Sequence, residues 1–337
     1  MPTYSFVIPV RNEEASLPEL HRRLSTVAEQ LDGDCEFVLV DDGSTDRSRE
    51  TMLEIRATDP RVRLLFLARN FGHQLAISAG LDFASGEAVV IMDADLQDPP
   101  EVALEMAALW REGYEVVHAV RRHRAGEGRL KLWTAHLFYR LLHRISDVEL
   151  PLDAGDFRLA DRRVVDIVRG MREPDRYLRG MFAWVGFRQT TVSYERDMRF
   201  AGTTKNSWTG MMRFALDGIL GFSVAPLRII LGLGFVMSAI ALLVGVIAIV
   251  LKLAGALPPV AGWASLVVLV AFLAGIQLIV LGTIGLYVAR AYEQGKHRPL
   301  YLVAERHGLG SPPAPADHVL GPQRDLGESS LDPAQHR

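Results

Sequence analysis

Short apolar runs alternate with amphipathic stretches over the first two hundred residues of the chain. The runs predict strands at Tyr4–Val10, Glu36–Val40, Val62–Leu67, Val89–Met92 and Glu115–Val120, and Gln189–Glu195 alternates like a further strand. Between the first two runs, apolar side chains recur at steps of three and four from Leu17 to Leu31, which gives a helix one apolar face. Strands that alternate with helices predict an α/β fold with a mostly parallel sheet covered on both faces.

Two long uncharged stretches follow this α/β pattern. Residues 229–251 lie between Arg228 and Lys252, and residues 253–289 lie between Lys252 and Arg290. A bilayer core of about 30 Å needs about 20 apolar helical residues, so each stretch holds one predicted transmembrane helix. Basic residues flank the outer ends of the pair, so the positive-inside rule predicts a cytoplasmic N-terminal domain in a multi-pass protein of the plasma membrane.

These patterns divide the chain into five predicted parts. They are an α/β domain at 1–208, an interfacial amphipathic helix at 209–227, a two-helix transmembrane region at 228–292, a cytoplasmic juxtamembrane segment at 293–307, and a disordered tail at 308–337. Gly275 and Gly282, seven residues apart, allow helices to approach closely, which admits a homo-oligomer such as a dimer or tetramer.

Composition excludes several classes of protein. The 37 basic and 40 acidic residues give a net charge of −3, so no global positive field attracts nucleic acid. The single cysteine, Cys35, excludes an intrachain disulfide and a cysteine-based zinc site. Met1–Arg11 runs into a strand without a basic region and an apolar core, so no signal peptide is expected.

Four polar clusters follow the predicted strands, at Arg11–Glu14, Asp41–Asp46, Arg69–Gln74 and Asp93–Asp98. In parallel sheets, ligands bind beyond the carboxyl ends of the strands. Asp93 and Asp95 are two positions apart on an extended chain and face the same way. Hard cations such as Mg²⁺ or Mn²⁺ prefer such oxygen ligands and are often shared with substrate phosphates. The alternative is that these aspartates only cap a helix at Glu101–Trp110.

Neither common phosphate-binding glycine loop is present, so a diphosphate needs a metal and cationic side chains. The basic run Arg121–Lys131 is a candidate grip for a phosphate or for acidic lipid heads, or else a solvated loop. A second candidate surrounds Gly202, with Arg199 and Lys205. Asp156 lies in a further polar cluster, Asp153–Arg158, either as a functional carboxylate or as a turn cap.

The ordered motifs VIPVRNEE, LVDDGSTD, RNFGHQ, MDADLQDPP, DAGDFR and RFAGTTK, followed by two apolar stretches, resemble a family 2 glycosyltransferase. More narrowly, they resemble the GtrB-like polyprenyl-phosphate glycosyltransferases, bacterial relatives of dolichol-phosphate mannose synthase. The resemblance covers about residues 3–300. Arg11 is a departure, because many relatives have Tyr there.

This resemblance implies a GT-A fold, a nucleotide-sugar donor and a polyprenyl phosphate acceptor. By motif position, the residues at the nucleoside are Pro9, Arg11, Glu13, Asp41 and Asp42. Those that set the metal on the diphosphate are Asp93, Asp95 and Gln97, with Ala94 among them. Those near the phosphates are Arg199 and Lys205, and those of the acceptor loop are Arg121, Arg124 and Arg129.

The implied reaction is in-line attack by a lipid phosphate oxygen on the anomeric carbon, with inversion. Because a phosphate monoester is largely ionised at neutral pH, a strong general base is less necessary. Asp156 is therefore a candidate for either a base or an orienting group, with Asp95 contributing through the metal, and His73 is expected to be structural. The resemblance ranks UDP-glucose first among donors, ahead of UDP-N-acetylhexosamine and GDP-mannose. The alternatives are transfer to another lipid and a non-catalytic membrane-anchored binding protein.

Overall fold

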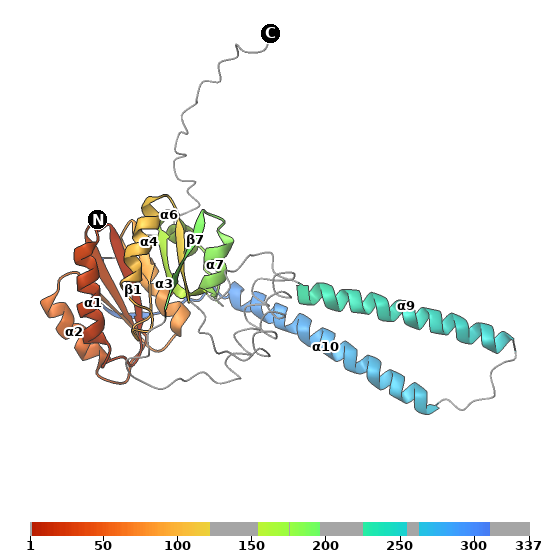
Figure 1. Cartoon of the computed structure of the whole chain (residues 1–337). Coiled ribbons are helices and arrows are strands. Elements are labelled where there is room, and N and C mark those ends of the chain that lie inside the picture. The colour runs from red at the N-terminus through yellow and green to blue at the C-terminus, as the bar shows by residue number, and fades with distance from the viewer. Residues whose placement is uncertain (1, 122–153, 175, 196–224, 255–262, 311–337) are drawn as a thin grey trace, which may run out of the picture.

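The computed structural model describes residues 2–121, 154–174, 176–195, 225–254 and 263–310 (Figure 1). The strands are β1 (Tyr4–Val10), β2 (Cys35–Asp41), β3 (Val62–Leu67), β4 (Ala88–Ile91), β5 (Val116–Arg121), β6 (Ala154–Asp161), β7 (Gln189–Tyr194) and β8 (Val303–His307). The helices are α1 (Leu17–Gln30), α2 (Ser48–Thr58), α3 (His73–Phe83), α4 (Val102–Arg111), α6 (Arg162–Gly170), α7 (Leu178–Trp184), α9 (Ala225–Leu253) and α10 (Trp263–Gly295).

The strands form one sheet in the order β7-β5-β6-β4-β1-β2-β3-β8. β1 pairs in parallel with β2 and β4, β2 with β3, and β5 with β7. β6 runs antiparallel between β4 and β5, and β8 runs antiparallel to β3 at the sheet edge. The predicted mostly parallel α/β sheet is confirmed, and each strand predicted from an apolar run is present.

β6 is a strand that the sequence analysis missed. Its sequence, AGDFRLAD, carries two aspartates and an arginine, so it lacks the apolar run of a buried strand. It nevertheless lies inside the sheet, and Arg158 is only 1% exposed. The alternative interpretation of Asp156 as a turn cap is therefore wrong, because this residue belongs to an antiparallel strand inside the sheet.

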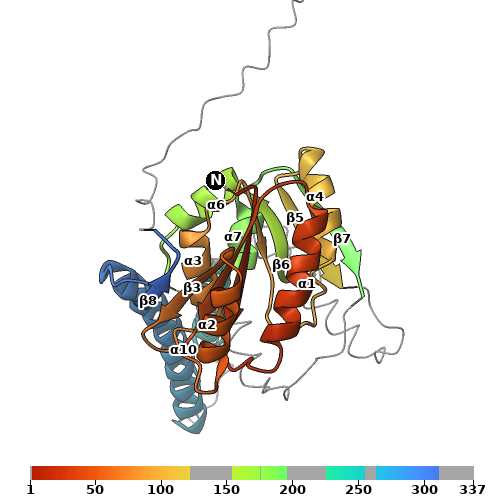
Figure 2. The same ribbon diagram turned by 90° about the vertical axis from the view of Figure 1, so that its left-hand side faces the viewer.

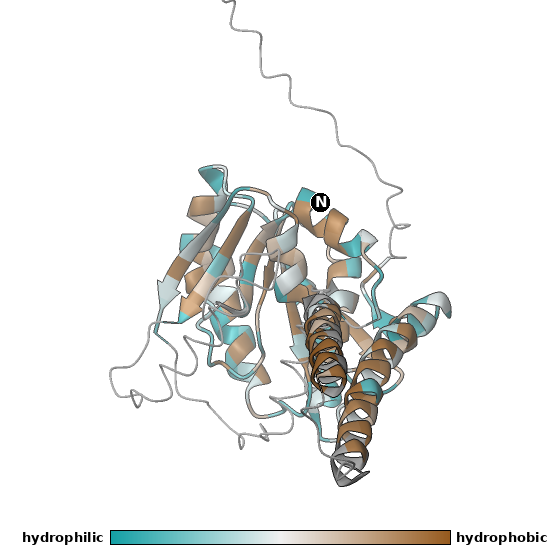
Figure 3. Cartoon of the chain, turned by 90° about the vertical axis from the view of Figure 1, so that its right-hand side faces the viewer, coloured by the Kyte–Doolittle hydropathy of each residue, from teal (hydrophilic) through white to brown (hydrophobic). Residues whose placement is uncertain are grey.

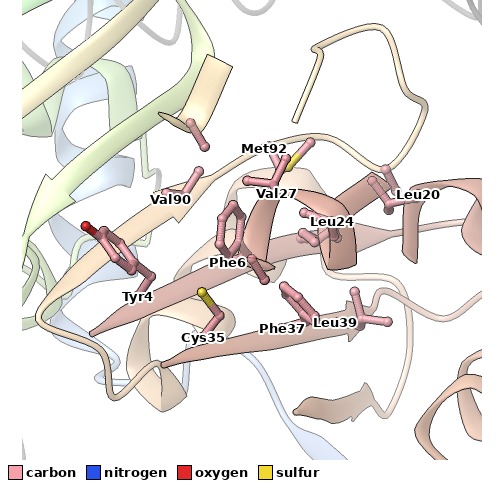
Figure 4. Close-up of a cluster of buried hydrophobic side chains, with 14 of the residues drawn as sticks. Tyr4, Phe6, Leu20, Leu24, Val27, Cys35, Phe37, Leu39, Val90 and Met92 are labelled. Atoms are coloured by element: carbon pink, nitrogen blue, oxygen red, sulfur yellow. The ribbon is translucent and has the colours of Figure 1, made fainter. Parts of the chain in front are cut away.

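Two hydrophobic clusters cover the two faces of the sheet. Alternate residues of β1 face opposite sides, so Phe6 packs with the residues of α1 and α4 while Val7 packs with those of α3, α6 and α7. Figure 4 shows the first cluster, in which Phe6 and Phe37 lie beside Leu24 of α1. This burial on both faces fixes the register of β1 and hence the position of the loop that follows it.

Gly80 lets α3 approach the sheet closely. A Cβ atom at this position would overlap Cγ1 of Val7 and lie 3.1 Å from Cγ2 of Val40. We expect Gly80→Ala to lower the free energy of unfolding by about 1–3 kcal/mol through overpacking. Thermal unfolding measures this, with Gly170→Ala as the control because no atom lies within 4 Å of its added Cβ. An unchanged midpoint for Gly80→Ala would contradict the packing argument.

α9 and α10 project away from the α/β domain, and both are apolar along most of their length (Figures 1 and 3). Many of the large apolar side chains whose burial is described in these helices are exposed, for example Leu231 at 63% and Leu278 at 69%. Within the described residues, one segment is long and apolar enough to cross a membrane, Phe272–Gly295. Of the interfacial helix expected at 209–227, residues 209–224 lie outside the described residues, and residues 225–227 form the start of α9. Of the tail expected at 308–337, residues 311–337 lie outside the described residues.

The chain returns to the α/β domain after α10. Residues 303–307, within the predicted juxtamembrane segment, form β8, which appears in blue beside β3 in Figure 2. The sequence VAERH shows no apolar run, and four of its five residues are exposed, so periodicity gave no signal for this edge strand.

Candidate active site

The predicted site residues gather at one edge of the sheet. Asp41 ends β2, and Asp93 comes two residues after β4 ends at Ile91. Because β6 is antiparallel, it presents its amino end at this same edge, and Asp156 is its third residue. His73 is the first residue of α3 and enters the site from the loop after β3.

Hydrogen bonds between the loops after β1, β2 and β3 hold this edge together. The backbone N–H of Asn12 donates to Ser44 Oγ at 3.0 Å, and the Thr45 N–H donates to Asn12 Oδ1 at 2.8 Å. The carboxylate of Asp42 accepts the N–H groups of Phe71 and Gly72 at 2.7 and 3.0 Å. Asp42 therefore orders the third loop, in addition to its predicted contact with a nucleoside.

Gly43 is required where the second and third loops cross. Its φ of +67° is in the left-handed region, and an added Cβ would lie 2.7 Å from the backbone nitrogen of Asn70. Only glycine adopts this conformation without strain and without displacing the neighbouring loop.

The residues predicted at the nucleoside occupy different environments. Pro9 is buried in β1, while Arg11, directly after this strand, is exposed. Glu13 accepts a hydrogen bond from the Ser16 hydroxyl at 2.6 Å at the start of α1. Asp41 Oδ1 accepts the Ser44 N–H at 3.1 Å.

Asp93 lies in a group of carboxylates. Its Oδ1 atom is buried and accepts no hydrogen bond within the described part of the chain, and His73 Nε2 is 3.4 Å away. Burial raises the pKa of Asp93 to about 6, the charge of His73 opposes this shift, and the nearby carboxylates of Asp98, Asp156 and Asp95 add to it. A folded protein keeps such a charge cluster only if a cation or a proton neutralises it.

Asp95 and its neighbours shape the loop beyond β4. The Gln97 N–H donates to Asp95 Oδ1 at 3.1 Å, and Leu96 between them has a φ of +61°. Ala94 is buried and Gln97 is half-buried. Among the described residues, no three His, Cys, Asp or Glu side chains are already arranged as a metal site. The turn places Asp93 and Asp95 at the sheet edge, but the described residues add no third His, Cys, Asp or Glu ligand to this pair.

Asp156 is surrounded by donors. It accepts hydrogen bonds from Arg179 Nε at 3.0 Å and Gln74 Nε2 at 3.1 Å, and His73 Nε2 lies 3.3 Å away. Burial alone would raise the pKa of Asp156, but the hydrogen bond with His73 and the charges of Arg179 and Arg158 outweigh it and lower the pKa far below its usual range. This carboxylate is therefore ionised at physiological pH and is a weak base.

Arg158 lies beneath Asp156 and is fully buried. Its Nη2 donates to the Gly155 carbonyl at 2.9 Å and its Nε to the Asp156 carbonyl at 3.2 Å. The guanidinium also stacks over Phe182 at 4.9 Å from the ring centroid. Arg158 thus fixes the backbone that orients Asp156 toward the site.

The structure adds three residues that the sequence analysis did not assign to the site. Gln74 and Arg179 contact Asp156 directly, and His73, expected to be structural, bridges Asp93 and Asp156. Burial lowers the pKa of His73, but the hydrogen bond with Asp156 and the charge of Asp93 raise it overall. The position of His73 in the RNFGHQ motif was a usable signal, whereas no spacing rule connects Arg179 with Asp156.

Arg121 is the one predicted acceptor-loop residue within the described part of the chain. Its Nη2 lies 3.6 Å from Asp98 Oδ1, and its Nε donates to the Tyr194 hydroxyl at 3.2 Å. Tyr194 in turn donates to Asp98. These contacts connect the ends of β5 and β7 to the loop after β4, which carries Asp93, Asp95 and Asp98 and is called the acidic loop below. The remaining predicted cations lie outside the described residues, namely Arg124, Arg129, Arg199 and Lys205.

Comparison with known proteins identifies the family. Residues 5–168 match the model of glycosyl transferase family 2. An uncharacterized glycosyltransferase of Bacillus subtilis strain 168 is 47% identical over 306 residues, which is 91% of this chain and 94% of that protein. The chain belongs to glycosyltransferase family 2. The bactoprenol glucosyl transferase of Shigella phage SfV is 39% identical over 300 residues, which is 89% of this family 2 chain and 97% of that protein.

Solved structures are similar to this chain only at low sequence identity. Mannosyl-3-phosphoglycerate synthase from Rubrobacter xylanophilus is 19% identical, with a TM-score of 0.46 over 69% of the family 2 chain and 75% of that structure. The family model and the two sequence relatives confirm the resemblance inferred from the six motifs, and the protein is a glycosyltransferase.

Proposed function

We propose that the enzyme transfers a sugar, with inversion, from a nucleotide-sugar to polyprenyl phosphate at the cytoplasmic face of the membrane. UDP-glucose is the first donor and undecaprenyl phosphate the first acceptor to test. The observation that carries the proposal is the buried oxygen of Asp93, which lacks a hydrogen-bond donor and lies among other carboxylates at the ligand-binding edge of the sheet. The phage relative named a bactoprenol glucosyl transferase supports the choice of acceptor and sugar.

The carboxylates fit a divalent metal ion. A buried carboxylate oxygen that accepts no hydrogen bond and lies close to like charges is a candidate ligand for a cation, and carboxylate oxygens suit Mg²⁺ and Mn²⁺. Asp93 and Asp95, with Gln97, are the residues that would hold it. When bound, such an ion stabilises the negative charge that develops on the nucleoside diphosphate leaving group.

Arginine side chains and the imidazole of His73 complement this role. The carboxylates of Asp93, Asp95, Asp98 and Asp156 form an acidic cluster. Asp156 holds His73 and Arg179 beside this cluster, and Asp98 and Tyr194 hold Arg121 there. Fixed cations stabilise phosphate charge without reorganisation during the reaction. Since the acceptor phosphate is already ionised, Asp156 acts in this proposal as an orienting group for these cations and removes no proton.

The return of the chain to the sheet supports two membrane crossings. Residues before α9 and after α10 belong to one domain, because β8 pairs with β3. A chain that leaves a domain and returns to it on the same side of a bilayer crosses that bilayer an even number of times. If Phe272–Gly295 is one crossing, α9 is the candidate for the other, since its 29 residues extend about 43 Å, longer than a bilayer core of about 30 Å.

A donor and acceptor screen tests this function. The full-length protein in lipid nanodiscs receives each of UDP-glucose, UDP-N-acetylglucosamine and GDP-mannose with undecaprenyl phosphate and Mn²⁺ or Mg²⁺, and mass spectrometry identifies the product. We expect one polyprenyl-phosphate sugar that mild acid hydrolyses, and no product without divalent metal. Transfer to diacylglycerol instead, or no metal-dependent release of nucleotide with any donor, would refute the proposal.

A further inference from the structure

The segment behind α10 is fastened to the catalytic domain at three places. β8 pairs with β3, the Leu302 carbonyl accepts the Ala68 N–H at 2.8 Å, and the Tyr301 hydroxyl donates to Asp82 Oδ2 at 2.7 Å. α10, the candidate membrane helix, ends at Gly295, so only the five residues 296–300 separate it from Tyr301. The connection is too short to act as a loose tether.

These contacts hold both ends of one structural unit. Ala68 directly precedes the loop 69–72, whose Phe71 and Gly72 amides bind Asp42 in the site. Asp82 lies near the other end of α3, the helix that begins with His73. The segment 301–307 therefore contacts the β3–α3 unit at two places, at Ala68 just before the loop 69–72 and at Asp82 near the end of α3.

The contact at Asp82 is buried and charged. Its side chain is 3% exposed and also accepts from Arg172 Nη1 at 2.7 Å, while Arg169 Nη2 donates to its backbone carbonyl at 3.0 Å. Tyr301 thus joins a network that links α3 to the chain following α6. A hydrogen bond in such a network is ordered by its neighbours as well as by its own geometry.

We propose that residues 301–307 form a strap that positions the loop 69–72 and the start of α3 relative to the last membrane helix. The membrane anchor then does more than hold the enzyme at the bilayer, because the shape of the donor site depends on it. The effect on donor binding rests on the proposed function, whereas the structural coupling does not.

Amide hydrogen exchange of the full-length protein in nanodiscs tests the coupling without any substrate. Tyr301→Ala removes the ring and its hydroxyl, and the milder Tyr301→Phe removes only the hydroxyl, which leaves the Asp82 carboxylate with its two partners Arg172 and Arg169. We expect amides of residues 69–72 to exchange about fivefold faster in Tyr301→Phe, the change that corresponds to one lost hydrogen bond, and faster still in Tyr301→Ala.

Arg306→Ala is the matched control. Arg306 lies in the same strand, and the hydrogen bond recorded for its side chain is to the Gly310 carbonyl at 2.9 Å. Exchange at 69–72 should stay at the wild-type rate in this variant. If the two Tyr301 variants accelerate exchange only within β8 and β3, and leave 69–72 unchanged, the strap is refuted.

A kinetic measurement extends the test to function. We expect Tyr301→Phe to raise the KM for the nucleotide-sugar about fivefold and to leave the KM for the lipid phosphate unchanged, since Arg121 of the predicted acceptor loop contacts Asp98 and Tyr194 and makes none of the strap's contacts. An unchanged donor KM together with faster exchange at 69–72 would refute the role in donor binding. Inactivity of the wild-type protein in the donor screen would instead refute the proposed function and leave the exchange result standing.

Discussion

Replacing Asp93 with Asn is expected to lower kcat/KM for sugar transfer by about a hundredfold or more and to make the metal-free protein more stable. The loss follows if this carboxylate holds the cation that neutralises the leaving diphosphate, an effect worth several kcal/mol. The gain follows because the buried Oδ1 atom accepts no hydrogen bond in the described part of the chain and lies near the charges of Asp98 and Asp156. Removing one like charge relieves that repulsion.

The opposite signs of the two effects separate a lost ligand from a misfolded protein. Kinetics with the product assay and thermal unfolding without metal measure them, and Asp34→Asn is the control because Asp34 is exposed and distant from the sheet edge that carries the site. We expect Asp95→Asn to abolish transfer as well without unfolding the domain. Wild-type turnover in Asp93→Asn, or a lower unfolding midpoint with normal metal dependence, would exclude the metal-ligand assignment.

The sequence predicts those parts of the fold that come from apolar runs. β1 and β2 are buried over their whole length, so their position and register follow from hydrophobic pattern alone. The acidic loop after β4 could also be located, because ligands of parallel sheets bind where strands end. β6 could not be found this way, since one face of this strand carries both Asp156 and Arg158, and the charges of these two residues are compensated only in three dimensions. β8 was not predicted for a related reason, because a short, charged edge strand lacks an apolar pattern.

The chemistry of Asp156 was equally beyond reach of the sequence. A carboxylate near an active site reads as a base or as an orienting group, and its pKa decides between them. That pKa depends on Arg179, which is distant in the chain, and on the direction in which a strand runs. Sequence motifs indicated the candidate residues, but the arginines beside Asp156 were visible only in the folded structure.

Replacing Asp156 with Asn is expected to have the largest effect on stability. Arg158 is 1% exposed, and the side chains of Arg179 and His73 also face this carboxylate. Removing one member of a buried charge network leaves the others uncompensated, which typically costs about 3–5 kcal/mol. We therefore expect a markedly lower midpoint of thermal unfolding at pH 7, together with loss of transfer.

The pH dependence of this loss gives the sharper test. Because the folded protein lowers the pKa of Asp156, its ionised form contributes stability above the pKa of an unfolded aspartate, near 4, and that contribution disappears as pH falls further. The difference in stability between wild type and Asp156→Asn should therefore be full at pH 7 and shrink below about pH 4. A difference that stays constant with pH would contradict the ion-paired state of this carboxylate.

A double variant identifies the source of the instability. If Asp156→Asn is harmful because it leaves Arg179 without its counter-charge, then adding Arg179→Gln should restore part of the lost stability, since the two side chains are in direct contact at 3.0 Å. Additive losses in the double variant would mean that the two residues act independently. Because Arg179 also supplies positive charge to the site in our proposal, the rescued protein should be folded yet still transfer sugar poorly. That combination would separate the contribution of Asp156 to folding from its proposed role in positioning cations at the donor phosphates.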